Sequence, residues 1–319
     1  MIITHLTALT LAAGLDKIIG DPKSLPHPVV WCGRLINFLE KKLNRGPHRK
    51  FKGIIFLAIV VSIVFSVVFF LVYAAYQIHF ICGIFVEALV ISYAICTKSL
   101  KEAALEVYEP LKRNDLQKSR KKLSQIVGRD TDDLGETEII RATVETVAEN
   151  TSDGITAPLF YALFGGASLC FVYRAVNTCD SMVGYRNDRF REFGWASAKM
   201  DDVLNFIPAR LSSVVMILVN RGEKVFSKKD CWRITKRDAK KHPSPNSGWL
   251  EAAFASLAGV QLGGLNYYEG VASFRPLLGE HKKDLELNHI ILSVKMMERT
   301  VYSFIIVLWL LGGLLHVIA

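Results

Sequence analysis

The sequence predicts an all-α, polytopic integral membrane protein with re-entrant or broken helices and a cytoplasmic helical segment. Of its 319 residues, 51% are hydrophobic, and the mean hydropathy of +0.27 exceeds that of ordinary soluble domains. Long uncharged runs alternate with basic segments that give a net charge of +9. This composition excludes a disordered chain, a collagen-like repeat and a small disulfide-stapled domain. In so apolar a chain, the basic charge indicates cytoplasmic loops rather than a nucleic-acid partner.

Four stretches are predicted to span the membrane. Residues 1–20 form the weakest, because this run carries His5, Asp16 and Lys17. Residues 54–76 contain no charge and are long enough to cross about 30 Å of hydrocarbon as a helix. Further predicted spans are 78–97, which would form an antiparallel hairpin with the preceding run, and 301–319.

The positions of Lys and Arg predict the orientation of the chain. Seven basic residues lie from Arg34 to Lys52, between the first two spans, and eight more follow the hairpin from Lys98 to Lys122. Because basic loops stay on the cytoplasmic side, we expect a multi-pass protein of the cell membrane. Segment 98–155 should then be cytoplasmic and helical, since Leu100, Ala104, Val107 and Leu111 recur at helical spacing.

Three apolar stretches are interrupted by Pro, Gly or charged residues, namely 156–176, 203–219 and 250–265. If the polar loops beside them are all cytoplasmic, these stretches are re-entrant or buried helices, which are tolerated where they line a protein cavity. The alternative is that they are plain spans. We interpret residues 1–319 as a single domain, without internal repeats.

An acidic helix is predicted at residues 135–150. At 100° per residue, Glu138, Glu145 and Glu149 fall within roughly 40° of one another. Asn150 and Asp153 follow directly and add hard oxygen ligands of the kind that suit Mg²⁺. The alternative interpretation is an exposed acidic helix face.

Further polar residues gather at the ends of the interrupted stretches. Asn177, Asp180 and Tyr185 follow one of them, and Asp201-Asp202 and Arg210 flank the next. Carboxylates and arginines in one region can hold Mg²⁺ and a polyphosphate together. Two histidines lie beside prolines, in Pro26-His27-Pro28 and His242-Pro243-Ser244-Pro245.

These residues resemble the cobalamin-biosynthesis family called CbiB or CobD, the adenosylcobinamide-phosphate synthases. The resemblance runs nearly end to end. Its motifs are Gly20-Asp21-Pro22, Leu25-Pro26-His27-Pro28, Gly128-Arg129-Asp130-Thr131, Val144-Glu145-Thr146-Val147-Ala148-Glu149-Asn150, Asn177-Thr178-x-Asp180-Ser181-Met182-x-Gly184-Tyr185, Asp201-Asp202-Val203-x-Asn205, Pro208-Ala209-Arg210 and His242-Pro243-Ser244-Pro245-Asn246-Ser247-Gly248. Cys179 and Lys199 depart from the residues common in the family but preserve size or charge.

The resemblance implies a ligase that joins adenosylcobyric acid to (R)-1-aminopropan-2-ol or its O-phosphate through an amide bond. It implies ATP and Mg²⁺ as requirements, a lipid bilayer around the chain, an active site facing the cytoplasm, and contact with other cobalamin-pathway enzymes. No nucleic acid is expected.

On this interpretation the candidate catalytic residues are His27, His242, Glu149 and Asp180. The candidate Mg²⁺ ligands are Glu145, Glu149, Asp153, Asp180, Asp201 and Asp202. Substrate or phosphate groups would be bound by Arg129, Arg141, Asn150, Asn177, Tyr185, Arg210, Asn246 and Ser247.

Three other functions remain compatible with composition and spacing. A membrane transporter of a corrinoid or phosphorylated metabolite fits the interrupted apolar stretches. A Mg²⁺-dependent prenyl- or phosphotransferase fits Asn177-x-x-Asp180 and Asp201-Asp202. A non-catalytic scaffold would leave the acidic and arginine-rich blocks without a purpose.

Overall fold

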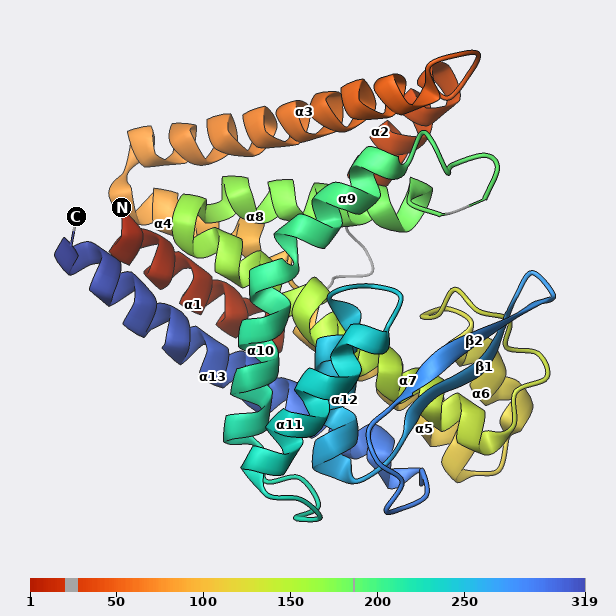
Figure 1. The fold of residues 1–319 in the computed structure, drawn as a ribbon. Helices are drawn as coiled ribbons and strands as arrows, with labels where there is room; N and C mark the ends of the chain where they lie inside the picture. Colours follow the sequence, from red (N-terminus) through yellow and green to blue (C-terminus); the bar gives the residue numbers. More distant parts are fainter. Residues whose placement is uncertain (21–27, 186, 319) are drawn as a thin grey trace. The chain divides into compact units, whose positions relative to one another are not determined.

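The computed structural model describes residues 1–20, 28–185 and 187–318 and is mainly helical (Figure 1). Among these residues, four helical segments are long and apolar enough to cross a membrane: Arg49–Ile78, Phe80–Lys112, Glu136–Val183 and Asn288–Ile318. The helices on either side of Asn205 would add a fifth crossing if they act as one broken span. The chain is a polytopic helical membrane protein, as the sequence predicts.

The contacts within the chain divide it into two compact units. Unit 1 comprises Met1–Cys96, Asp153–Asn205 and Ile305–Ala319, and unit 2 comprises Thr97–Ser152 and Phe206–Phe304. Each unit is assembled from stretches that lie far apart in the sequence. No composition shift or linker therefore marks the division, which is why the sequence does not reveal it.

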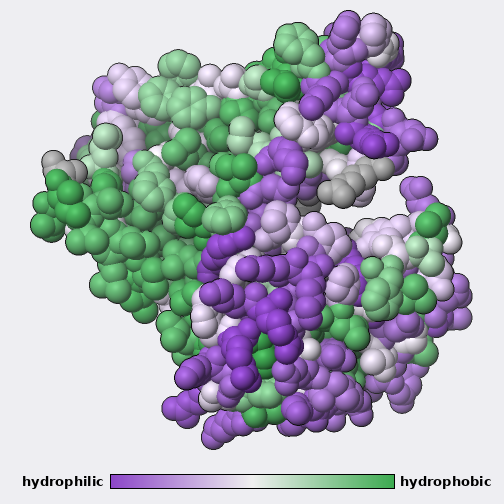
Figure 2. Space-filling view, viewed as in Figure 1, coloured by the Kyte–Doolittle hydropathy of each residue, from purple (hydrophilic) through white to green (hydrophobic). Residues whose placement is uncertain are grey.

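Unit 1 is a bundle of helices. Its elements are α1 (Ile2–Ile18), α2 (Pro28–Leu43), α3 (Arg49–Ile78), α4 (Phe80–Ser92), α8 (Ala157–Val183), α9 (Trp195–Leu204) and the last part of α13 (Asn288–Ile318). The side-chain N–H of Trp309 donates to the hydroxyl of Thr10 at 2.9 Å and joins α13 to α1. These two helices run side by side in Figure 1, and their outer surface is largely apolar in Figure 2, as expected for helices that face lipid.

The predicted spans of unit 1 correspond to helices, with altered lengths. α3 has 30 residues and extends beyond the predicted 54–76 at both ends. The run 78–97 is shorter than expected, because α4 has 13 residues and ends at Ser92. α1 is a 17-residue helix that packs against α4.

α8 is broken in the middle, as expected of the stretch 156–176. Gly165 and Gly166 leave helical geometry, and Gly166 adopts φ 56° and ψ −148°. The backbone N–H of Ala167 donates to the buried carboxylate of Glu87 at 3.2 Å, so a side chain from α4 caps the second half of α8. Glu87 also accepts from His5 and, at 2.6 Å, from the hydroxyl of Tyr76. A Cβ atom at Gly166 would lie 1.8 Å from Glu87 Oε1, so only glycine fits this break.

Unit 2 combines short helices with a β-hairpin. Its elements are α5 (Thr97–Lys112), α6 (Leu116–Leu123), α7 (Glu136–Thr151), α10 (Phe206–Val219), α11 (Lys228–Asp238), a 3₁₀ turn (Ala239–Lys241), α12 (Ser247–Ala258), β1 (Leu262–Tyr268), β2 (Val271–Leu278) and the first part of α13. A π-helical turn, Ser152–Thr156, follows α7 and leads to α8. Leu100, Ala104, Val107 and Leu111 of α5 are buried, which confirms the predicted apolar face.

The stretch 250–265 begins as a buried helix, one of the forms that we expected, but it ends as a strand. α12 ends at Ala258, because Gly259 takes a left-handed conformation with φ 71°, and the chain continues into β1. The strands pair antiparallel around a two-residue turn at Glu269 and Gly270, both of which have positive φ. The apolarity of this stretch arises from its burial within unit 2. The stretch 203–219 is interrupted at Asn205, between α9 and α10.

Candidate active site

The acidic helix α7 begins with a cap that occupies one of the three predicted glutamates. The backbone N–H of Gly135 donates to the carboxylate of Glu138 at 2.8 Å. This N–H group has no acceptor within the helix backbone, so the side chain supplies one. Glu138 therefore fixes where α7 starts. The other two glutamates, Glu145 and Glu149, lie about two and three turns nearer the end of α7 and remain as candidate site residues.

Glu145 forms a buried ion pair with Arg129. Only 1% of Glu145 and 8% of Arg129 is exposed, and Arg129 Nη2 lies 2.6 Å from Glu145 Oε2. The other carboxylate oxygen accepts the backbone N–H of Gly263 at 2.8 Å. These contacts rule out an exposed acidic face at Glu145. They also give both of its oxygens a partner within the protein.

Two arginines tie α7 to the β-hairpin. Arg141 donates to the carbonyl oxygens of Gly263 and Leu265, the latter at 2.8 Å. The side-chain oxygen of Asn266 accepts from Arg129 at 2.7 Å and from Arg141 at 3.2 Å. These contacts fix both guanidinium groups in place before any ligand arrives.

The hairpin backbone makes this approach possible. Gly264 has φ 98°, and a Cβ atom there would lie 2.6 Å from Arg141 Nη1. A larger residue at this position would combine backbone strain with a clash against the guanidinium. Glycine at the start of β1 thus lets Arg141 lie against the strand.

A histidine and a buried glutamate form the second part of the unit 2 site. His242 Nε2 lies 3.6 Å from Glu251 Oε1, and 1% of Glu251 is exposed. Among the described residues, neither oxygen of Glu251 has a hydrogen-bond partner. His242 Nδ1 lies 3.0 Å from the backbone nitrogen of Ser244 and 3.3 Å from its carbonyl oxygen. The backbone N–H of Ser244 can donate to an unprotonated Nδ1, and its carbonyl oxygen can accept from a protonated Nδ1. Nε2, which faces Glu251, can therefore carry a proton or lack one.

Burial shifts the pKa of both groups toward their neutral forms. Desolvation, reinforced by the charges of Glu145 and Glu149, raises the pKa of Glu251 well above its usual range. Desolvation also lowers the pKa of His242, and the nearby charge of Glu149 only partly opposes this. Desolvation opposes a rise in the pKa of Arg275 of β2, but Tyr268 and then these glutamates outweigh it and raise that pKa. Both shifts favour an uncharged imidazole beside a protonated carboxyl.

The remaining predicted residues of unit 2 make contacts of their own. Ser247 donates its hydroxyl to Glu149 Oε1 at 2.8 Å, which links the start of α12 to α7. Arg210 donates to the side-chain oxygen of Asn246 at 3.1 Å and stacks over the ring of Phe206. Asn150 donates to a carbonyl oxygen of its own helix.

A second polar cluster lies within unit 1. Asp201 accepts from the side-chain amides of Asn177 at 3.1 Å and Asn205 at 3.0 Å. The hydroxyl of Tyr173 donates to Asn205 Oδ1 at 2.7 Å and lies 3.1 Å from the carbonyl oxygen of Asp153. The break between α9 and α10 therefore holds a network that joins three of the predicted residues.

The other predicted residues of unit 1 have different surroundings. Asp202 lies 3.5 Å from the ammonium group of Lys199. Asp180 is half-buried near the end of α8, and Tyr185 is 56% exposed. His27 lies outside the described residues.

The predicted metal ligands fall into two sets. Glu145 and Glu149 belong to unit 2, whereas Asp153, Asp180, Asp201 and Asp202 belong to unit 1. Within the ranges that the structure describes, no three His, Cys, Asp or Glu side chains are arranged to hold a metal ion. The donors themselves are hard carboxylate oxygens of the kind that Mg²⁺ prefers. The unpartnered oxygens of buried Glu251 show that this region can accept a proton or a cation.

Sequence reasoning missed three residues of the unit 2 site, namely Glu251, Asn266 and Arg275. Glu251 could have been identified as the single carboxylate in an apolar, Ala- and Gly-rich stretch. Asn266 and Arg275 depend on the hairpin. The turn signal Glu269-Gly270 between two runs rich in aromatic and aliphatic residues could have indicated it.

Comparison with known proteins adds the family context. A family model described as CobD/Cbib protein matches residues 9–297. A relative from Halalkalibacterium halodurans, named cobalamin biosynthesis protein CobD, is 52% identical over 318 residues, covering 100% of both chains. Proteins of the same name from Clostridium perfringens and Leptospira interrogans are 45% and 41% identical, covering 86% and 94% of this chain and 88% and 95% of their own. No solved structure matches.

Proposed function

Because this chain belongs to the CobD/CbiB family, we propose that it is the cobalamin-biosynthesis enzyme that joins adenosylcobyric acid to an amine. The amine would be (R)-1-aminopropan-2-ol or its O-phosphate, and ATP with Mg²⁺ would drive the amide bond. The observation that carries the proposal is the unit 2 site, where buried arginines adjoin a His–Glu pair built for proton transfer.

The reaction needs an activated carboxyl group. A carboxylate does not acylate an amine at neutral pH, because hydroxide is a poor leaving group; transfer of a phosphoryl group from ATP to the carboxylate supplies a better one. Such a transfer depends on cations that hold the phosphate oxygens in place. Arg129 and Arg141 are pre-positioned by the hairpin, and Arg210 presents a partly exposed guanidinium next to Asn246. These three side chains would bind phosphate or substrate carboxylate.

His242 would accept the proton of the incoming ammonium group. Its lowered pKa keeps the imidazole neutral, so that it can act as a base near pH 7. When Nδ1 donates to the carbonyl oxygen of Ser244, Nε2 has a free lone pair and can take the proton. The carbonyl oxygen of the protonated Glu251 carboxyl, 3.6 Å from Nε2, would then face the N–H of the imidazolium.

Each unit has its own carboxylates that would supply Mg²⁺ ligands, Glu149 in unit 2 and the aspartates in unit 1. Glu149, Asp153, Asp180, Asp201 and Asp202 provide hard oxygens, and bound Mg²⁺ would neutralise charge on the phosphates of ATP. Glu145 is engaged by Arg129 and Gly263, so its proposed part is to position Arg129. An Asp180→Asn variant that folds and keeps the wild-type Mg²⁺ dependence would remove Asp180 from this set.

The basic segments that flank the spans support a location in the cell membrane with the site facing the cytoplasm. ATP and the corrinoid would then reach the site from the cytoplasm, where other cobalamin-pathway enzymes could deliver the substrate.

A ligase assay on detergent-purified protein tests the proposal. Adenosylcobyric acid, aminopropanol phosphate and MgATP are combined, and mass spectrometry follows the corrinoid. We expect a product heavier by the amine less one water, formed only with ATP and Mg²⁺. A corrinoid that binds and stays unchanged would contradict catalysis and favour a carrier or scaffold.

Two histidine variants separate the proposed base from general effects. His242→Gln should lower the rate by about 10²-fold or more, the usual range for loss of a general base. His281→Gln is the matched control, because His281 is exposed and pairs with Asp284 on the surface of unit 2. Equal rates for the two variants would exclude His242 as the base.

A further inference from the structure

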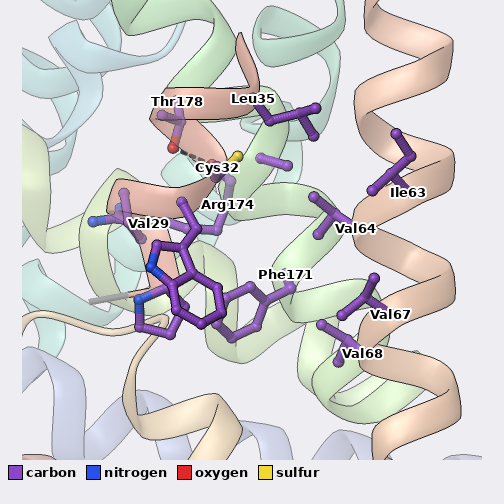
Figure 3. Close-up of a pocket in the computed structure, with 13 residues that line it drawn as sticks. Val29, Cys32, Leu35, Ile63, Val64, Val67, Val68, Phe171, Arg174 and Thr178 are labelled. Carbon is purple, nitrogen blue, oxygen red and sulfur yellow. Dashed lines mark hydrogen bonds between the residues drawn. The ribbon is translucent and has the colours of Figure 1, made fainter. Parts of the chain in front are cut away.

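A cavity of about 230 Å³ lies within unit 1, between α2, α3 and α8 (Figure 3). α3 contributes Ile63, Val64, Val67 and Val68, which share one face of that helix, and α8 contributes Phe171, Arg174, Ala175 and Thr178. The wall from α2 includes Val29, Trp31, Cys32 and Leu35. The lining is therefore apolar except for a few side chains on one side.

The cavity opens to the lipid-facing side of a membrane helix. Ile63 and Val67 are 42% and 63% exposed, although both also line the cavity. They lie midway along α3, the most apolar candidate span of the described residues, and thus at hydrocarbon depth. Trp31 is 61% exposed, and tryptophan favours the membrane–water interface. The cavity thus extends from an interfacial residue toward the acyl chains.

One side of the cavity carries a positive charge that no described residue neutralises. Among the described residues, Arg174 has no ion-pair partner, and its buried Nε has no hydrogen-bond acceptor. Thr178 donates its hydroxyl to the backbone carbonyl oxygen of Arg174 and leaves the guanidinium free. Figure 3 places Arg174, Thr178 and Cys32 on the side away from the α3 valines. A guanidinium within an apolar helix is costly unless an anion meets it.

The size of the cavity limits what can enter it. Pockets for drug-sized ligands measure about 300–1,000 Å³, so 230 Å³ is too small for a whole nucleotide or corrinoid. A segment of a single hydrocarbon chain fits both the volume and the apolar walls. The free guanidinium requires that this chain belong to an anionic molecule.

We propose that this cavity binds an acyl chain of an anionic phospholipid, whose phosphate pairs with Arg174. The bound lipid would fill the space between α2, α3 and α8 and neutralise a charge that the helices leave open. This site is separate from the ligase chemistry proposed above and does not depend on it.

Native mass spectrometry of the detergent-purified protein tests the site. The protein is incubated with phosphatidylglycerol or with phosphatidylcholine of the same chain length, and the retained lipid is counted. We expect phosphatidylglycerol to be retained about tenfold more than phosphatidylcholine. Arg174→Gln should abolish the preference, whereas Arg191→Gln, which removes an exposed charge elsewhere in unit 1, should keep it.

A second pair of variants tests the apolar part without touching the charge. Val64→Phe adds volume inside the cavity and should lower retention of both lipids. Leu71→Phe adds the same kind of volume on an exposed position of α3 that does not line the cavity, and should have no effect. Arg174→Lys keeps the charge and should keep the preference for phosphatidylglycerol. This result would show that the loss in Arg174→Gln comes from the missing charge and not from a folding defect.

Two results would overturn the proposal. The first is equal retention of phosphatidylglycerol by wild type, Arg174→Gln and Val64→Phe. The second is loss of the preference for phosphatidylglycerol when millimolar inorganic phosphate is added. Arg174 would then bind a soluble phosphate group and not a lipid. Neither result bears on whether the protein forms the corrinoid amide.

Discussion

The buried pair of Arg129 and Glu145 allows a sharp test, because Glu145→Gln removes one charge while preserving side-chain shape. At 2.6 Å and an effective dielectric constant near 20, the attraction between the two charges is about 6 kcal/mol. Desolvation offsets much of this while the pair is intact. Removing one partner leaves a buried charge uncompensated, which typically costs about 3–5 kcal/mol.

The stability of unit 2 should therefore fall markedly in Glu145→Gln. For a domain of about 150 residues, this loss lowers Tm by roughly 10 °C. Differential scanning fluorimetry in detergent measures the shift. Glu298→Gln is the matched control, because it breaks a more exposed ion pair with Lys101 in the same unit and should cost about 1 kcal/mol or less.

A double variant separates stability from function. Arg129→Met combined with Glu145→Leu replaces the ion pair by apolar side chains and should recover most of the lost stability. The recovered protein should still lack ligase activity, because Arg129 is proposed to bind an anionic group. The reasoning is refuted if Glu145→Gln melts within 2 °C of wild type while requiring more Mg²⁺, since Glu145 would then serve the metal and not Arg129.

Three further variants test other features. Gly166→Ala places a Cβ atom 1.8 Å from the carboxylate that caps α8, and should destabilise unit 1 by about 2 kcal/mol or more in thermal scans, whereas Gly313→Ala, with open space around it, should be neutral or stabilising. Because burial raises the pKa of Glu251, the unfolded chain loses this proton at a lower pH than the folded chain, and stability declines as pH rises. Glu251→Gln removes the effect, so its Tm should exceed that of wild type by a margin that grows from about pH 5 to pH 8; a constant margin would contradict this. Glu149→Gln should raise the Mg²⁺ concentration needed for half-maximal rate, whereas Ser247→Ala, which removes only a hydrogen-bond donor to Glu149, should change it far less.

Much of the helical architecture could be predicted from local sequence patterns. The uncharged run at 54–76 needs no tertiary information to identify a span, and it lies within α3. The spacing that buries Leu100 and Val107 is equally local. The paired glycines at 165 and 166 likewise mark the break in α8. Each of these features depends on residues a few positions apart.

The contacts that define the candidate site are not local. Arg129 and Asn266 are separated by 137 positions, and Glu149 and Ser247 by 98, so no periodicity reports that they meet. The spacing of Glu145 and Glu149 on one helix face suggested that they share a cation. The structure instead gives Glu145 an arginine partner supplied by a preceding loop.

The hairpin was overlooked for a related reason. Hydropathy shows that residues 250–265 are buried. A buried helix and a buried strand have the same mean hydropathy, so this quantity does not distinguish them. The distinction depends on Gly259, Gly263 and Gly264, whose positive φ angles end α12 and start β1. Glycine permits such angles without requiring them, so the sequence alone leaves the choice open.

The discontinuous composition of the two units has a consequence for biosynthesis. Unit 1 contains both α1 and the last part of α13, and Thr10 on α1 receives its hydrogen bond from Trp309 on α13. At about 5–20 residues per second, a ribosome needs roughly 15–60 s to translate the 299 positions between them. Throughout that time α1 lacks its partner helix, and unit 2 must be made before unit 1 can close. Closure of unit 1 therefore waits until α13 has been translated, and α1 depends on the membrane and the insertion machinery until then.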